Sequence, residues 1–373
     1  MVILATIFFS YMYSSYSAYN RLCGYSLYVV FFMTIVLVIL EIKNIFNQKR
    51  FSLIVSLILI ISVLLASIIN NTGLGSVAIL LILACAMLLT EIIKFDNKLL
   101  NIICFIITIG DILFLLSKKT YYNTNVCGYL TFAMLPFSMT FLEGEKEDRK
   151  IRKIVGIILS VIIAIWSIIV IQNSESRGAL LGFIVFIIVK FCNNGVLKNK
   201  KFYNVFIALI LGSTLAFVFL YVRMWNQGVD FKIPFSDKSL YSGREAIWSE
   251  LLEAYNSKEN FLYGLGSKYN IQSFKVMNVH NSSLYILVIY GGLNFIIYSG
   301  LLYSTLIKNN KYISNPKNKI FMAAIIGMLV VSFFETNIEW TDVNIYFILA
   351  MIFSCNINEK GNKNEKKIQR IDD

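Results

Sequence analysis

The chain has 373 residues, of which 57% are hydrophobic and only 15% are charged, and its mean hydropathy is +0.68. A water-exposed globular surface does not accommodate so much apolar area, so the composition argues against a soluble protein and predicts an all-α, polytopic membrane helix bundle. The net charge of +12 would suit nucleic acid in a soluble protein, but its placement along the chain has another explanation, and we expect no nucleic-acid partner.

The predicted elements are apolar runs long enough to span a bilayer, which takes about 20 residues as a helix. Twelve such runs can be read in chain order: 1–19, 22–40, 51–69, 74–93, 99–117, 125–142, 152–171, 177–192, 203–222, 282–307, 320–335 and 340–355. The first run lacks a basic leader and a cleavage site before Arg21, so we expect a retained helix. Residues 1–355 then form one transmembrane domain with a long polar loop, 223–280, and residues 356–373 form a disordered basic tail.

The basic residues predict the orientation of these spans. Short cytoplasmic loops keep Lys and Arg, whereas translocated loops lose them. With the N-terminus inside, the inner loops and the tail hold 23 of the 34 basic residues, while the short outer loops keep only Arg21, Lys118, Lys119 and Arg177. We therefore expect both termini to be cytoplasmic, loop 223–280 to lie on the outer face, and the inner charge to face anionic lipid headgroups.

Two arginines stand at predicted helix starts on the outer face. Arg177 opens the span 177–192, and interfacial snorkelling is the ordinary explanation for a basic residue there. Arg244 lies in Ser242-Gly243-Arg244-Glu245, which has the spacing of a capping box and opens an amphipathic helix within the long loop. Free backbone N–H groups and a guanidinium suit phosphate, although a solvated surface arginine is an equally good explanation of Arg244 alone.

The only histidine, His280, closes the long loop directly before the span 282–307, so we expect its imidazole at the outer membrane boundary. A lone histidine is more often an ordinary hydrogen-bonding residue than a catalyst, but its unperturbed pKa is the one that suits a general base at neutral pH. Three acidic residues flank the last outer turn and could hold the arginines or act as the base instead: Glu335, Glu339 and Asp342.

Asp111 is the clearest charge within a predicted span. An unpaired carboxylate in hydrocarbon is costly, so we expect a partner, with Arg177 or an outer lysine as the candidates. The alternatives are a protonated carboxyl or contact with water near Lys118.

Three short sequence patterns follow one another along the chain, all on the predicted outer face. They are Ser176-Arg177-Gly178-Ala179, then Ser242-Gly243-Arg244 with Trp248 and Tyr263-Gly264-Leu265-Gly266, then Val279-His280-Asn281-Ser282-Ser283-Leu284 with Tyr290-Gly291-Gly292-Leu293. A weaker pattern is Asn123-Thr124-Asn125 with Gly128. Together, over residues 121–293, they resemble the S-R-G-A, S-G-R…W…G-x-G, H-N-x-x-L and N-x-N…G elements of the bacterial O-antigen polymerase and O-antigen ligase superfamily of multispanning glycosyltransferases.

The resemblance implies transfer of glycan from an undecaprenyl-pyrophosphate carrier to an acceptor sugar hydroxyl, on the outer face of the bacterial plasma membrane. Negative charge develops on the leaving pyrophosphate, and fixed cations would stabilise it. The outer loops contain no D-x-D signature, so we expect neither metal nor cofactor. The expected roles are pyrophosphate binding by Arg177 and Arg244, general-base catalysis by His280, and substrate binding by Asn281, Asn123, Asn125 and Trp248.

Three functions stay open. A polymerase joins lipid-linked repeat units to one another. We favour this function because such enzymes occur in capsule, exopolysaccharide and O-antigen gene clusters of many bacteria. A flippase and a chain-length regulator of the same pathway would be its partners. A ligase moves the finished chain to another acceptor such as lipid A core. A transporter or flippase without chemistry would instead place polar groups near the bilayer midplane, with interrupted helices.

Overall fold

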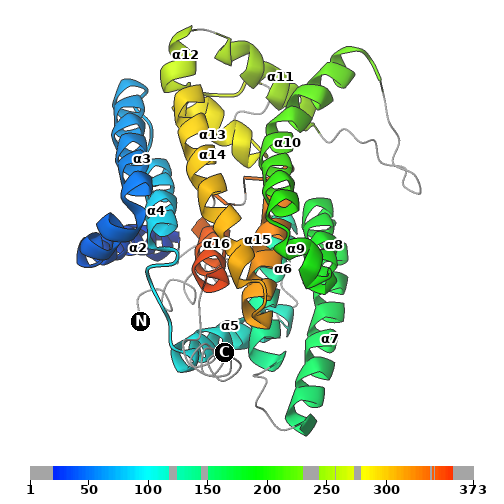
Figure 1. Ribbon diagram of the computed structural model, residues 1–373. Coiled ribbons are helices and arrows are strands. Elements are labelled where there is room, and N and C mark those ends of the chain that lie inside the picture. The colour runs from blue at the N-terminus through cyan, green and yellow to red at the C-terminus, as the bar shows by residue number, and fades with distance from the viewer. Residues whose placement is uncertain are drawn as a thin grey trace.

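The computed structural model describes residues 20–116, 124–143, 150–229, 243–256, 258–272, 279–336, 338–339 and 341–355. Every regular element within these ranges is a helix (Figure 1). The helices are α2 (Asn20–Leu40), α3 (Ile42–Ile69), α4 (Leu74–Leu89), α5 (Asn97–Leu116), α6 (Thr124–Glu143), α7 (Lys150–Asn173), α8 (Arg177–Phe191), α9 (Asn194–Lys198), α10 (Lys200–Asn226), α11 (Arg244–Tyr255), α12 (Lys258–Tyr263), α13 (Ser282–Tyr290), α14 (Gly292–Leu306), η2 (Ile307–Tyr312), α15 (Pro316–Val331) and α16 (Thr341–Ser354). The predicted first span, 1–19, and the predicted tail, 356–373, lie outside the described residues.

Five of the described helices are long and apolar enough to cross a membrane: α3, α5, α6, α7 and α10. Shorter apolar helices cover Leu27–Leu40, Leu74–Leu89 and Asn344–Ser354. Length and apolar composition together confirm the prediction of a helical membrane protein.

Helix α7 shows how such a helix packs when lipid is the solvent. Its outward residues are large and apolar, with Ile151 and Ile158 exposed, whereas Gly156, Ser160 and Ala164 are buried at four-residue spacing. Small residues let two helices approach closely. A Cβ atom on Gly156 would lie 1.9 Å from the carbonyl oxygen of Leu142, so α7 and α6 meet backbone to backbone.

Lysines cap the C-termini of three helices at one end of the bundle, which we call the basic end. The last carbonyl groups of a helix have no partner within it, and they attract cations. Lys49 donates to Met87 O at 3.2 Å at the end of α4, Lys94 to Cys355 O at 3.2 Å after α16, and Lys319 to Cys192 O at 2.6 Å after α8. Part of the charge that the sequence assigned to lipid headgroups therefore binds the protein's own backbone.

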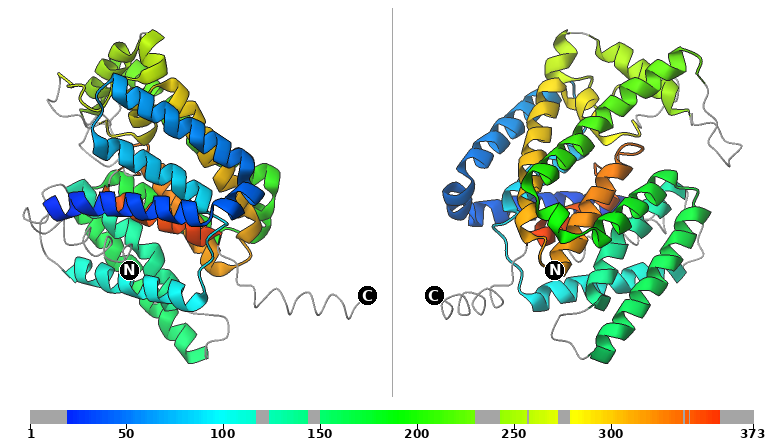
Figure 2. Two further views of the ribbon diagram at one scale, coloured as in Figure 1. Left: turned by 90° about the vertical axis from the view of Figure 1, so that its left-hand side faces the viewer. Right: turned by 45° about the vertical axis from the view of Figure 1, so that its right-hand side comes forward.

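The segment 282–307, predicted as a single span, is a helical hairpin, and that prediction was wrong. Asn281, at the start of α13, lies 3.3 Å from Thr214 O in the middle of α10, and α13 then packs along the second half of α10. The chain reverses at Gly291, which has a φ of +90°. Helix α14 returns toward the start of α10, where the Tyr203 hydroxyl donates to Leu306 O at 3.3 Å (Figures 1 and 2). The Gly291-Gly292 pair is the sequence signal of this turn, and the apolar residues on both sides of it led to the prediction of a continuous span.

The long loop begins later than predicted, because α10 continues to Asn226, but the predicted amphipathic helix is present as α11. The Tyr263–Gly266 turn fastens this loop to the hairpin. Leu265 N donates to Val288 O at 2.6 Å and Gly266 N to Ile289 O at 3.2 Å, which satisfies carbonyls freed by the end of α13. The side-chain amide of Asn70, after α3, donates to the Tyr263 and Gly264 carbonyls at 2.6 and 3.0 Å.

Candidate functional site

One carboxylate joins two of the predicted catalytic residues. Glu335 Oε1 accepts from Arg244 Nη2 at 2.8 Å, and its Oε2 lies 2.8 Å from His280 Nδ1. Asn125 Nδ2 is 3.4 Å from the same Oε1. The side chain of Glu335 is 3% exposed, against 20% for Arg244 and 21% for His280. We call Glu335, Arg244 and His280 the Glu335 bridge.

The Glu335 bridge is assembled by the turn that follows α15. This turn is bonded to the start of α13, because Ser282 N donates to Ser332 O at 3.1 Å, Ser282 Oγ to Glu335 O at 3.3 Å, and Asn281 Nδ2 to Phe333 O at 3.1 Å. Asn281 is fully buried, and its Oδ1 caps α13 by accepting from Leu284 N at 2.8 Å. Asn281 therefore positions its neighbour, and its predicted role as a direct substrate ligand has no support in this environment.

His280 itself has a φ of +51°, in the left-handed region that side chains other than glycine seldom adopt. The hydrogen bonds of Asn281 and Ser282 hold the backbone there. Such strain, held by surrounding contacts, is found at sites where a side chain must be aimed.

Helix α11 carries Arg244 and is anchored by Trp248. The indole N–H of Trp248 donates to Val279 O at 2.7 Å, one residue before His280, and the ring packs edge-on against Phe217 and Tyr221 of α10. Trp248 is 1% exposed, so it is a core anchor rather than the predicted substrate contact. Glu245 Oε1 accepts from Gly243 N at 3.1 Å, so the acidic side chain reaches back to the N-cap residue, but this residue is Gly243 rather than the predicted Ser242, which lies outside the described residues.

Arg177 opens α8, as predicted, and its side chain is exposed. A Cβ atom on the next residue, Gly178, would lie 3.3 Å from Phe334 Cβ, so the helix start adjoins the turn that carries Glu335. Gly128 of α6 packs against the same region, where an added Cβ would lie 2.5 Å from Ser176 Cβ. In the described part of the chain, none of the contacts of Glu335 involves the Arg177 guanidinium. The structure therefore brings Arg244 and His280 together on Glu335, whereas Arg177 begins a helix whose start adjoins the turn that carries Glu335.

The other predicted acids differ in environment. Glu339 is 4% exposed, and burial raises its pKa to about 7, with a smaller opposing effect from the Ser282 hydroxyl. Asp342 belongs to α16, but its side chain lies outside the described residues, as does all of Asn123. Among the described residues, no group of three or more His, Cys, Asp or Glu side chains is arranged to hold a metal ion.

Asp111 has a different partner from the arginine or lysine that we expected. Its Oδ2 accepts from Ser138 Oγ of α6 at 2.6 Å, and the residue is fully buried between α5 and α6. A hydroxyl on a neighbouring helix supplies the hydrogen bond that the sequence alone assigned to a cation.

Two residues near the site were not among the candidates. Tyr129 of α6 is buried close enough to Glu335 and Arg244 for both charges to act on its hydroxyl, and Ser282 links α13 to the Glu335 turn. A tyrosine in an aromatic-rich span and a serine after Asn281 carry no sequence signal of their own.

No protein family, no curated protein and no solved structure matches this chain.

Proposed function

We propose that this protein is a glycosyltransferase that polymerises undecaprenyl-pyrophosphate-linked repeat units of a bacterial surface polysaccharide. Its site would face the outer side of the plasma membrane, in a domain of twelve spans with both termini cytoplasmic. The observation that carries the proposal is the Glu335 bridge, which places an imidazole and a guanidinium on the two oxygens of one buried carboxylate.

The bridge defines what each nitrogen of His280 can do. An ionised carboxylate only accepts hydrogen bonds, so Nδ1 would carry the proton in the pair with Glu335, and the lone pair of the neutral ring would be on Nε2. Nε2 would take the proton of the acceptor hydroxyl as its oxygen bonds to the anomeric carbon. The bond from that carbon to the pyrophosphate oxygen breaks, and the electron pair leaves with undecaprenyl pyrophosphate.

The two arginines would stabilise the leaving group. Arg244 lies beside the base with its guanidinium oriented by Glu335, and Arg177 begins the neighbouring helix with an exposed side chain. Fixed cations act where the charge develops, so they lower the transition state more than the ground state. In this mechanism no metal is needed, and activity should survive EDTA.

The helical hairpin sets the depth of the site. Asn281 lies level with Thr214, and α10 continues for twelve more residues, which at 1.5 Å per residue is about 18 Å. Along the axis of α10, the site thus lies below the end of this helix. A recessed site suits a donor whose polyprenyl chain stays in the bilayer while its sugar is attacked.

The same hairpin favours a second candidate, a transporter or flippase of lipid-linked oligosaccharides. Interrupted helices with polar groups away from the helix ends are typical of transporter binding sites. The enzyme proposal predicts lengthened glycan from purified protein and lipid-linked repeat units in detergent, where no membrane barrier exists. Product that forms only when lipid A core is supplied would instead indicate a ligase, and activity limited to transport across sealed vesicles would indicate the transporter.

A further inference from the structure

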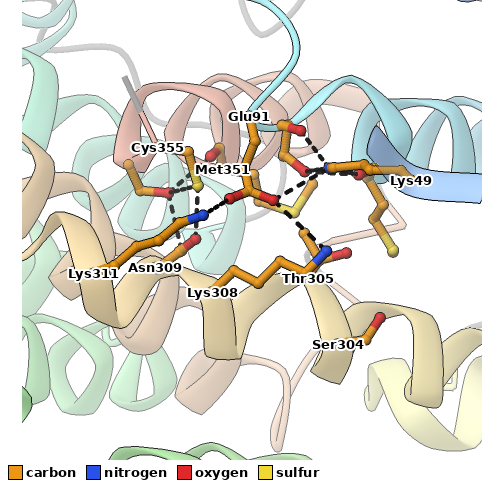
Figure 3. Close-up of polar contacts among 12 residues, drawn as sticks. Lys49, Glu91, Ser304, Thr305, Lys308, Asn309, Lys311, Met351 and Cys355 are labelled. Atoms are coloured by element: carbon orange, nitrogen blue, oxygen red, sulfur yellow. Dashed lines mark hydrogen bonds and ion pairs between the residues drawn. The ribbon is translucent and has the colours of Figure 1, made fainter. Parts of the chain in front are cut away.

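A second polar cluster lies at the basic end and shares no residue with the Glu335 bridge (Figure 3). Its centre is Glu91, which follows α4 and has a φ of +68°. Glu91 Oε1 is 2.5 Å from Lys311 Nζ, and its Oε2 is 3.6 Å from Lys308 Nζ and 3.8 Å from Lys49 Nζ. The Tyr312 hydroxyl donates to Oε1 at 3.0 Å.

The charges of this cluster do not balance. Among the described residues, three lysines share this one carboxylate, namely Lys49, Lys308 and Lys311, which leaves a net charge of +2. Like charges held together in a partly desolvated place are costly unless an anion compensates them.

The cluster is closed on one side and open on the other. The side chain of Lys49 is 4% exposed and is held by the carbonyls that end α4, whereas Lys308 is 37% and Lys311 55% exposed. Burial alone would lower the pKa of Lys311, but its hydrogen bond to Glu91 raises it above the usual value, so this ammonium stays charged. Each ammonium has three donors. Glu91 takes one donor of Lys311, whereas its 3.6 Å contact with Lys308 is an ion pair without a hydrogen bond.

We propose that Lys308 and Lys311 bind the phosphate of an anionic phospholipid headgroup, with Glu91 and the buried Lys49 holding the two lysines in position. A lipid is the occupant that fits the surroundings. The cluster lies at the ends of apolar helices, and Phe46 and Phe51, on either side of Lys49 in α3, are 50% and 78% exposed. Apolar surface beside a cationic pocket suits a molecule with acyl chains and a phosphate.

The bound headgroup would stabilise the fold, because Glu91 connects three separate segments: α3 through Lys49, the end of α4, and η2 through Lys308 and Lys311. An anion that neutralises the excess charge strengthens this connection. Binding to the folded state raises the unfolding temperature in proportion to the logarithm of ligand concentration above the dissociation constant.

The test is a titration of the detergent-purified full chain with phosphatidylglycerol, read as the midpoint of thermal unfolding. We expect the midpoint of the wild type to rise with phosphatidylglycerol and not with phosphatidylcholine. The double variant K308Q/K311Q should weaken the apparent affinity by about thirtyfold, since each lysine near an anionic lipid surface contributes ~1 kcal/mol. K308R/K311R should retain the response.

Two controls separate lipid binding from a general effect of charge. K200Q/K201Q removes two exposed lysines at the start of α10 and should respond to phosphatidylglycerol as the wild type does. E91Q should lower the midpoint without lipid and reduce the rise that lipid produces, because it removes the carboxylate that holds Lys308 and Lys311 in position. Equal responses of K308Q/K311Q and K200Q/K201Q would overturn the proposal, and so would a wild-type response reproduced by inorganic phosphate alone.

Discussion

His280 Nδ1 lies 2.8 Å from Glu335 Oε2, on a carboxylate that is almost completely buried. These residues are 55 positions apart, and they meet because the start of α13 is bonded to the turn after α15. The pairing fixes both the orientation of the imidazole and the nitrogen that carries its proton. In the proposed mechanism Glu335 is a positioning residue, and the alternative role of base that the sequence left open for it is not needed.

Replacing Glu335 with glutamine should lower the rate of glycan extension by about 10³–10⁴-fold, by analogy with the loss of the orienting carboxylate in a catalytic triad. The amide can donate to Nδ1 and thereby favour the tautomer in which Nε2 is protonated and cannot act as base. In the double variant H280A/E335Q the two losses should not add, because the two residues act as a unit. The exposed Glu253 of α11 supplies the control, since E253Q should keep full activity. Additive losses would show that Glu335 acts independently of His280.

The two arginines should differ in their effect on stability. R244A leaves Glu335 buried without its cation, and we expect a loss of about 1–3 kcal/mol in the free energy of unfolding together with loss of activity. R177A removes an exposed side chain and should change stability by no more than about 0.5 kcal/mol while lowering kcat/KM for the lipid-linked donor. Thermal unfolding and steady-state kinetics of the two variants check this. An R177A protein with unchanged kcat/KM would remove Arg177 from the pyrophosphate site.

The sequence predicted the parts of this structure that depend on local pattern. Apolar run lengths located most of the described helices, and the spacing around Arg244 located α11. It did not predict the hairpin at Gly291, because a reversal buried in protein leaves the apolar composition unchanged. The sequence also predicted a cation as the partner of Asp111 and a substrate contact for Trp248. In the structure, Asp111 binds a hydroxyl on another helix and the Trp248 indole binds Val279 O. Both contacts depend on tertiary packing, which residue spacing does not report.

Alanine at Gly264 should destabilise the protein and weaken activity. Gly264 has a φ of +74°, and an added Cβ would lie 2.5 Å from Ile289 O, so the turn that fastens the long loop to α13 must shift. We expect a loss of about 1–3 kcal/mol from backbone strain and overpacking.

Gly300 in α14 is the matched control for this substitution. Nothing lies within 4 Å of a Cβ there, so G300A should be neutral or stabilising by up to about 1 kcal/mol through helix propensity. Thermal unfolding measures both variants. Equal behaviour of G264A and G300A would show that the Tyr263–Gly266 turn does not hold the loop.

Stability should depend on pH through Glu339. Its pKa is raised from 4.5 to about 7, so the folded protein holds this proton more tightly than the unfolded chain. The stability that the protonated Glu339 carboxyl contributes is therefore complete below about pH 4.5 and is lost as the pH rises toward about 7. The free energy of unfolding changes by an amount on the order of 3 kcal/mol. E339Q should match the wild type near pH 4 and unfold at a higher temperature at pH 8. A wild type and an E339Q variant that differ equally at both pH values would contradict this environment for Glu339.

The most direct test of the proposed function is glycan extension by purified protein in detergent, with lipid-linked repeat units as donor and acceptor, comparing the wild type with H280A. We predict lengthened glycan on undecaprenyl pyrophosphate from the wild type in the presence of EDTA, and a rate lower by about 10²–10⁴-fold from folded H280A. Extension by H280A at the wild-type rate would contradict His280 as the base, and a wild type that makes no product with any acceptor would contradict the enzyme itself.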